Sequence, residues 1–394
     1  MASFLPFRAL RYSDTQPLAE VTAPPYDVLS DADRSALAAR HPHNVVLVDV
    51  PVESDGPDRY NMAAKQFAAW LAVGIIERDS HASYYRYTMR FIDETGRTRQ
   101  VVGVFGALEV SEPSERRVLP HEQTTPKAKT DRLDLTQATN ANLSAVWGLS
   151  MAPGVGALIA KARAKTLGTF TADDGVHHIV ERIASSADID AIQAAIASAP
   201  VVIADGHHRY AISRQYRDEH GGLASHTLTF VVELAADQLV IQPIHRLLNG
   251  ITSTQFEKEL ASFFEMSEAG SVSPATLADM STVGALCLVR ANGTGVLLKP
   301  RAEAFTGCRD LDSERLERAL DNIAHTKTYQ HGVDNIVAAL SSGSSGQYGV
   351  LLRSVPIHEI ERTANEGLLM PPKSTFFAPK PRTGVVFRTM DPDV

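Results

Sequence analysis

The stretch APVVIADGHHRYAISRQYRDEHG, residues 199–221, joins an apolar run to a helix-like run through a polar turn. Residues 201–204 are all apolar, which is typical of a buried strand. Asp205 and Gly206 follow directly, and the residues after them predict a helix. The first turn of such a helix presents free backbone N–H groups at the positive end of the helix dipole. This arrangement binds anions, phosphate above all.

Each residue of the turn fits a role in an anion site. Gly206 lets the backbone come close to a ligand or adopt a positive φ, while His208 and Arg209 add hydrogen-bond donors in the first helical turn. Asp205 is expected either to cap the helix or to hold a metal ion that bridges phosphates. The alternative is a structural turn, in which Asp205 is an N-cap and the histidines are solvated.

The histidines near this turn also raise the hypothesis of a metal centre. The candidate ligands are His121, Glu122, His207 and His208. Adjacent histidines do not share one face of a helix, so the spacing of an H-E-x-x-H zinc site is absent. The sequence therefore favours a phosphate site over a dedicated zinc site.

A second polar segment, HEQTTPKAKTDR at residues 121–132, precedes another predicted helix. Hydroxyls and cations concentrated on one loop suit the binding of phosphate or carboxylate, and a solvated charged loop is the alternative. Glu122 is the preferred general base for a hydroxyl nucleophile, and Lys127 and Arg132 are expected to neutralise phosphoryl charge. The remaining candidates for contact with substrate here are His121 and Thr124.

Asp27 is a third candidate, because it follows the rigid segment APPY at residues 23–26. Prolines 24 and 25 impose an extended backbone, and Ser30 is then predicted to cap a helix. Asp27 is expected to bind a substrate ammonium group or to act as the second candidate base. The alternative is that Asp27 only ends a turn.

Composition restricts the class of protein. The 394 residues suffice for two or three domains, and 44% hydrophobic with 21% charged residues is ordinary for a globular protein. A net charge of -8 and a pI near 6.0 lack the basic character of duplex-DNA binding proteins. The two cysteines form no framework, and no apolar stretch reaches membrane-spanning length. We expect a cytoplasmic protein with no membrane or nucleic-acid partner.

The order of predicted elements suggests an α+β protein. Up to about residue 250, hairpins are predicted at 83–110 and 168–183 and helices at 59–74 and 188–199. Beyond that point, helices alternate with strands and a hairpin at 285–300. The tail at 368–388 is rich in proline, aromatic and basic residues and is expected to pack rather than to be disordered.

The segment VVIADGHHRYA resembles the signature of the ParB/sulfiredoxin-like superfamily, in which a strand, a turn and a helix bind nucleotide phosphates. Within it, DGHHR is similar to the version of free serine kinases, which phosphorylate the hydroxyl of L-serine with a nucleotide. Sulfiredoxin carries a catalytic cysteine where His207 stands here, so sulfinic-acid reduction is not implied. The resemblance implies that Gly206, His207, His208 and Arg209 bind the nucleotide.

More of the chain resembles the DUF1015 family, a family of unknown function. The similarity covers nearly the full length, in the segments APPYDVLS, HEQTTPKAKTDR to NANLSAVWGL, IADGHHRY, PIHRLL and MPPKSTFFAPKPRTG. PIHRLL adds Arg246 as a candidate substrate-binding residue. The resemblances together imply a mixed-sheet ParB/sulfiredoxin-like nucleotide-binding core with insertions in residues 1–250. Residues 251–394 would then form a C-terminal α+β region whose tail packs back on the core.

The resulting hypothesis is a small-molecule kinase that transfers a phosphoryl group from ATP or ADP, with Mg²⁺, to the hydroxyl of a free amino acid such as L-serine. Asp205 would hold the metal, and Glu122 or Asp27 would activate the hydroxyl. Two alternatives stay open: a ParB-like nucleotide-dependent switch without metabolic activity, and a metal-assisted phosphohydrolase. A homodimer also stays open.

Overall fold

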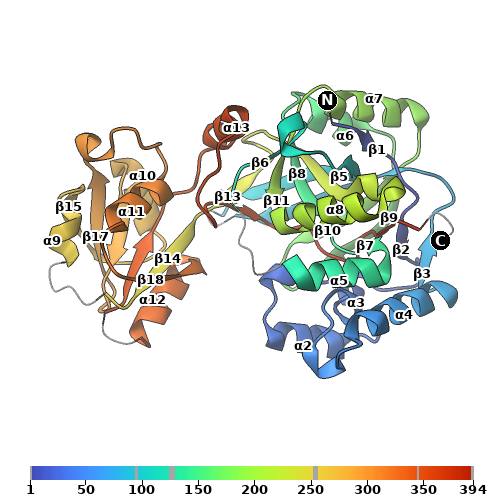
Figure 1. Cartoon of the computed structure of the whole chain (residues 1–394), viewed down its shortest axis with the longest axis horizontal. Coiled ribbons are helices and arrows are strands. Elements are labelled where there is room, and N and C mark those ends of the chain that lie inside the picture. The colour runs from blue at the N-terminus through green and yellow to red at the C-terminus, as the bar shows by residue number, and fades with distance from the viewer. Residues whose placement is uncertain (1, 94–95, 124–128, 252–255, 344–345, 392–394) are drawn as a thin grey trace. The chain divides into compact units, whose positions relative to one another are not determined.

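The computed structural model describes residues 2–93, 96–123, 129–251, 256–343 and 346–391 (Figure 1). The chain forms two compact units. Unit 1 consists of Met1–Val240, Ala364–Leu368 and Pro379–Val394, and unit 2 consists of Ile241–Thr363 and Leu369–Ala378. The last segment of the chain therefore belongs to unit 1, although it follows unit 2 in the sequence.

Unit 1 is built on a nine-stranded sheet of mixed direction. Two neighbouring pairs are parallel, β6 with β11 and β8 with β12, and the other pairs with a described register are antiparallel. Strand β1 (Phe4–Leu5) pairs with β5, and the order of the others is β6 (Val118–Pro120), β11 (Val201–Asp205), β8 (Val146–Ser150), β12 (His226–Glu233), β5 (Thr98–Glu109), β4 (Tyr84–Ile92), β10 (His177–Ile183) and β9 (Lys165–Thr171). This mixed sheet, together with the helices, confirms the predicted α+β class.

The hairpins predicted from alternating apolar and polar residues are confirmed. Strands β4 and β5 pair around the turn at Gly96, and β9 pairs with β10. The helix predicted at 59–74 is α4 (Arg59–Ala72), and Ser30 caps α2 (Asp31–Arg40) in a capping box with Asp33. Local sequence patterns therefore determine these elements of unit 1.

Apolar side chains of unit 1 form two main clusters. The first joins the sheet to α6 (Val155–Lys161) and α7 (Ser186–Ala197), and it includes Tyr210 of α8 (His207–His220). The second joins α2, α3 (Val46–Asp49), α4 and α5 (Lys129–Thr139) to the small sheet of β2 (Leu10–Tyr12) and β3 (Ile76–Arg78). Helices α5 and α8 contact each other, so α8 lies next to a helix of the second cluster.

The last part of the C-terminal tail, from Pro379 onward, belongs to unit 1, whereas Leu369–Ala378 belong to unit 2. Thr383 pairs with Ala23, and β21 (Arg388–Thr389) pairs with β7 (Ala141–Asn142). Phe387 is fully buried in the second cluster, and the Arg382 guanidinium donates to the carbonyl of Thr22. These contacts hold the backbone of residues 382–389 in place.

Unit 2 contains a six-stranded sheet in which every pair is antiparallel. Neighbouring residues of β16 belong to different apolar clusters, Leu286 and Leu288 to one and Cys287 and Val289 to the other, so both faces of the sheet are covered. The strand order is β15 (Phe264–Ser271), β17 (Thr294–Pro300), β16 (Leu286–Val289), β19 (Tyr348–Leu351), β14 (Ile244–Asn249) and β18 (Thr326–His331). Helices α9 (Phe256–Leu260) and α11 (Asp312–Leu320) contribute to the first cluster, and α10 (Thr276–Val283) and α12 (Val333–Ser341) to the second.

No helix in the described ranges is long and apolar enough to cross a membrane.

Candidate functional site

The strand–turn–helix unit predicted at residues 199–221 is confirmed. Strand β11 ends at Asp205, and α8 begins at His207. Gly206 has a φ of 85°, in the left-handed region that favours glycine. A Cβ at Gly206 would lie 3.0 Å from Nε of Arg209, so the missing side chain also makes room for this guanidinium. The residue before α8, Gly206, has no side chain that could cap the helix.

Asp205 does not cap the helix but forms two ion pairs. Its Oδ2 lies 2.5 Å from Nη2 of Arg209, and its Oδ1 accepts a 2.7 Å hydrogen bond from Nζ of Lys380. The same ammonium group donates to Oδ2 of Asp27 at 3.1 Å. Arg209 also donates to the carbonyl of Ala145. Lys380, from the C-terminal tail, thus joins the carboxylates of two segments far apart in the sequence.

Burial and charge act in opposite directions on this cluster. Burial alone would raise the pKa of Asp205, but the charges of Lys380 and Arg209 outweigh it and hold that pKa well below its ordinary value. Burial alone would lower the pKa of Lys380, but Asp205 and Asp27 outweigh it and raise that pKa. At neutral pH, Asp205 is therefore an ionised carboxylate and Lys380 an ammonium.

Asp27 lies on the short 3₁₀ turn Tyr26–Val28, directly after the two prolines. Its side chain is 27% exposed, so it is the most accessible carboxylate of the cluster, and its Oδ2 lies 3.9 Å from Nη2 of Arg209. The preceding Tyr26 contacts two guanidiniums, since Cζ of Arg132 lies 4.3 Å and Cζ of Arg209 lies 5.8 Å from the ring centroid. The segment APPY therefore places Tyr26 and Asp27 beside the first turn of α8.

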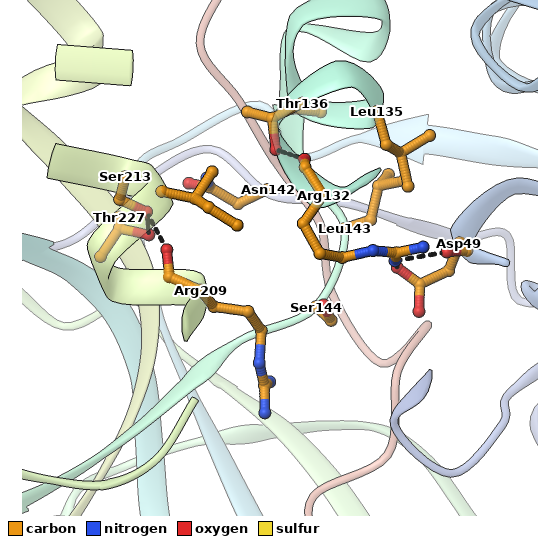
Figure 2. Close-up of a pocket in the computed structure, with 12 residues that line it drawn as sticks. Asp49, Arg132, Leu135, Thr136, Asn142, Leu143, Ser144, Arg209, Ser213 and Thr227 are labelled. Atoms are coloured by element: carbon orange, nitrogen blue, oxygen red, sulfur yellow. Dashed lines mark hydrogen bonds and ion pairs between the residues drawn. The ribbon is translucent and has the colours of Figure 1, made fainter. Parts of the chain in front are cut away.

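Arg132, from α5, makes a buried ion pair with Asp49 at the end of α3 (Figure 2). Nη1 of Arg132 lies 3.3 Å from the Asp49 carboxylate and donates to the Asp49 carbonyl at 2.5 Å. Burial raises the pKa of Asp49, although Arg132 and Arg209 lower it in part. Arg132, a candidate from the sequence, thus lies beside Tyr26 and Arg209 and is the second buried guanidinium of this region.

A small pocket of about 40 Å³ lies between these two arginines. Arg132 from α5 and Arg209 from α8 both line it, and Figure 2 shows the Arg132 side chain reaching Asp49 while the Arg209 side chain runs in another direction. Further walls come from hydroxyl, amide and apolar side chains of α5, of β7 and the segment after it, of α8 and of β12: Leu135, Thr136, Ala141, Asn142, Leu143, Ser144, Ile212, Ser213 and Thr227. The pocket adjoins the cluster of Asp205 and Lys380 because Arg209 belongs to both.

The histidines lie at the same edge of the sheet. His121 follows β6, which pairs with β11, and its Nδ1 lies 2.6 Å from the carbonyl oxygen of Ile203. Burial lowers the pKa of His121, so the ring is neutral at pH 7. The ring centroids of His121 and His207 are 5.0 Å apart. Glu122 is half-buried and follows His121 in the sequence. Its charge acts to raise the pKa of His121, against the effect of burial.

The other predicted residues are not placed in this cluster. Arg246 lies on β14 in unit 2, where it is buried, donates to the carbonyl of Ile244 at 2.7 Å and lies over the ring of Tyr329. Thr124 and Lys127 lie outside the described residues.

A family model described as "Protein of unknown function (DUF1015)" matches residues 4–323. The chain belongs to this DUF1015 family. No curated protein matches the sequence.

This DUF1015 chain has low overall similarity to several solved structures. A free serine kinase variant in complex with AMP is 13% identical, covering 71% of this chain and 88% of that one, with a TM-score of 0.40. A conserved hypothetical protein from Pyrococcus furiosus is 13% identical, with coverage of 70% and 90% and a TM-score of 0.37. SbnI from Staphylococcus aureus with a C-terminal truncation is 12% identical, with coverage of 71% and 84% and a TM-score of 0.38.

Two residues of the site of this DUF1015 chain were not predicted. Lys380 is the clearer one, since it lies in the segment MPPKSTFFAPKPRTG, and the prolines on either side of it are a signal for a rigidly held lysine. Asp49 is the other, and only its position directly after the apolar run at 45–48 distinguishes it. Among the residues described, no three His, Cys, Asp or Glu side chains are grouped so that they could hold a metal ion.

Proposed function

We propose that this protein is a small-molecule kinase that transfers a phosphoryl group from ATP or ADP to the hydroxyl of a free amino acid, with L-serine as the first candidate. One observation carries the proposal. Arg209 and Lys380, two buried cations, lie with the carboxylates of Asp27 and Asp205 at the start of α8, which follows Gly206. Anion-binding N–H groups, cations and a carboxylate base are the parts that phosphoryl transfer requires.

The nucleotide phosphates would bind at the start of α8. Backbone N–H groups after Gly206 would donate to phosphate oxygens, and His207 and His208 stand in the same turn. Arg209 and Lys380 would stabilise the negative charge that develops on the transferred group and on the leaving nucleotide. Their side chains are only 9% and 10% exposed, so their charges are weakly screened by water.

Magnesium commonly binds phosphate oxygens, water and one or two protein carboxylates. Asp205, with Asp27 close by, supplies carboxylates of this kind, and the low pKa of Asp205 keeps it ionised. These residues fit the ion, which would neutralise phosphate charge when bound. Lys380 donates to both carboxylates.

The acceptor hydroxyl would be activated by a carboxylate. Its proton passes to the base, its oxygen forms the new bond to phosphorus, and the bond from phosphorus to the leaving nucleotide oxygen breaks. Asp27 is the more accessible of the two acids that pair with Lys380, which supports it as the base. Glu122 is the alternative base, because it follows β6 next to the end of β11.

Further predictions about the protein belong to the same proposal. We assign to unit 1 a ParB/sulfiredoxin-like core, because β11, Gly206 and α8 form the strand–turn–helix unit of that superfamily's signature. We place the protein in the cytoplasm, and a homodimer stays open. The predicted division at residue 250 also stays a proposal, with Arg246 as a substrate-binding residue.

The test is a transfer assay with the full chain. Purified protein is incubated with Mg²⁺, labelled ATP or ADP and a panel of hydroxyl amino acids, and phosphorylated products are separated by mass. We expect phosphoserine, with its formation lost in Asp27→Asn and retained in Glu122→Gln. The reverse pattern would assign the base to Glu122. Phosphate release without a phosphorylated amino acid would indicate a hydrolase and would overturn the proposal, and nucleotide binding without either product would indicate a switch protein.

A further inference from the structure

The pocket between Arg132 and Arg209 contains polar groups that, apart from Arg209, the proposed phosphate site does not use (Figure 2). It is lined on one side by α5, on the other by α8, and between them by the segment 141–144. One water molecule occupies roughly 10–15 Å³ of such space. A pocket of about 40 Å³ therefore accepts a group of a few heavy atoms, which excludes a nucleotide.

Several hydrogen-bond donors of this pocket are unused. Within the described ranges, Nη2 of Arg132 and the hydroxyl of Ser144 have no hydrogen-bond partner, since the bonds of Arg132 come from Nε and Nη1. Nδ2 of Asn142 is also unused, because the bonds of this amide are accepted by its Oδ1. A guanidinium, a hydroxyl and an amide on one small pocket are the donors that a carboxylate accepts from.

The pocket also contains one acceptor for a cation. Asp49 lines it, and the Asp49 side chain is 3% exposed. Its ion pair with Arg132 is 3.3 Å long and uses only Oδ1 for the side-chain contact. Unused donors and a carboxylate thus lie side by side, and an α-amino acid carries the matching carboxylate and ammonium on one carbon atom.

The position of the pocket fits a role in the same reaction. Arg209 lines the pocket and is paired with Asp205, while Tyr26 contacts Arg132 and Arg209 together. Asp27, the proposed base, is the next residue after Tyr26. A ligand group held in the pocket therefore lies close to the cluster that would carry out the transfer.

We infer that this pocket is the subsite for the α-carboxylate and α-ammonium groups of the amino-acid acceptor. Arg132, Ser144 and Asn142 bind the carboxylate, and Asp49 binds the ammonium. This inference rests on the proposed kinase function and names the part of the site that would select amino acids among hydroxyl compounds.

The experiment measures the binding of three ligands to the full chain by calorimetry. L-Serine has both groups, glycerate lacks the ammonium, and ethanolamine lacks the carboxylate. We expect L-serine to bind about tenfold or more tightly than either relative, because each lost charge-assisted bond costs about this factor. Equal affinity for all three, or no binding of L-serine at millimolar concentration, would overturn the inference.

Variants identify the residues. Ser144→Ala is expected to lower the affinity for L-serine and glycerate about fivefold or more and to leave the affinity for ethanolamine unchanged. Only the first two ligands present a carboxylate to the Ser144 hydroxyl. Ser35→Ala is the matched control, since its hydroxyl lies on α2 and donates to the carbonyl of Asp31. Arg132→Met should abolish L-serine binding, and its thermal melt reports whether the loss of the Asp49 pair unfolds it. Unchanged L-serine affinity in a folded Arg132→Met and in Ser144→Ala would contradict the assignment.

The two proposals can fail separately. If L-serine binds in a manner that depends on Ser144 but is not phosphorylated, the kinase proposal fails and the amino-acid subsite stands. If L-serine is phosphorylated and its KM is unchanged in Ser144→Ala and in a folded Arg132→Met, the subsite fails and the kinase proposal stands.

Discussion

The two units of the molecule each bury ion pairs, but they arrange them differently. In unit 2, Asp312 and Arg353 form a closed pair: Nε and Nη2 of Arg353 donate to the two carboxylate oxygens at 3.0 and 2.5 Å, and the Arg353 backbone N–H donates at 2.8 Å. In unit 1, the Asp205 carboxylate is divided between Arg209 and Lys380, and Lys380 is divided between Asp205 and Asp27.

This difference separates a structural pair from a candidate site. The closed pair of unit 2 satisfies both carboxylate oxygens within itself, so removal of one partner would leave an uncompensated buried charge. The open cluster of unit 1 lies at the start of α8, where the N-cap residue is Gly206. The positive end of the helix dipole there favours a ligand anion. The expected effects of substitution differ accordingly between the two regions.

The largest effect is expected from breaking the closed pair. Arg353→Ala leaves the Asp312 carboxylate, 4% exposed, without its partner and should lower the free energy of unfolding of unit 2 by about 3 kcal/mol. Chemical denaturation measures the change, and nucleotide affinity should stay the same. The matched control is Arg301→Ala, whose ion pair with Glu265 is exposed. A loss no larger than that of the control would show that the closed pair does not stabilise unit 2.

A pH dependence is expected from the buried histidines of both units. Burial lowers the pKa of His178 in unit 1 to about 3 and that of His245 in unit 2 to about 4. The unfolded chain binds these protons near pH 6.5 and the folded chain does not, so stability is complete above pH 6.5 and falls as the pH decreases. Between pH 6.5 and pH 4, each histidine should lower the free energy of unfolding by on the order of 3 kcal/mol.

The check is denaturation of the full chain across that range. His178→Gln should flatten the loss of stability on acidification in unit 1, because glutamine does not take up a proton. His81→Gln, a substitution of an exposed histidine, is the control. A slope in His178→Gln equal to that of the unsubstituted chain would contradict a neutral buried His178.

A smaller effect is expected from removing the Lys380 ammonium from the cluster of unit 1. Lys380→Met leaves Asp27 and Asp205 without their shared ammonium, which raises the pKa of Asp205 and should lower nucleotide affinity about tenfold. Titration calorimetry measures the affinity. Lys161→Met, an exposed lysine at the end of α6, is the control. Unchanged affinity in a folded Lys380→Met would limit Lys380 to a role in stability.

The smallest effect is expected at the turn. Gly206→Ala forces a Cβ into the left-handed region and to 3.0 Å from Nε of Arg209, so it should cost about 1 kcal/mol of stability and weaken nucleotide binding about threefold. Gly154→Ala is the matched control, because Gly154 precedes α6 with a φ of 83° but has open space around it. Equal affinities in the two variants would show that displacement of Arg209 does not affect the ligand.

Much of unit 1 could be predicted from local sequence. The apolar run at 201–204, followed by Gly206, determines a buried strand and a turn with positive φ. Alternation determines the β4–β5 hairpin, and Ser30 with Asp33 determines the start of α2. These signals depend on neighbouring residues, so one sequence suffices to interpret them.

The cluster itself could be predicted only in part. Asp27, Asp205 and Arg209 were candidates because each follows a rigid or structured segment, and they do lie together. Lys380 joins them across 175 residues of sequence from Asp205, and no local pattern encodes such a contact. Arg246 was a candidate on resemblance alone, and it stays a prediction; in unit 2 its guanidinium donates to the Ile244 carbonyl.

The central claim is that the first turn of α8 binds nucleotide phosphates, and calorimetric titration of the full chain with ADP or ATP tests it most directly. The unsubstituted chain should bind, and Arg209→Ala should lose about a hundredfold or more in affinity. Arg214→Ala, on the same helix but paired with Glu112, should keep it. Equal nucleotide affinity in Arg209→Ala and Arg214→Ala, with both variants folded, would contradict the account.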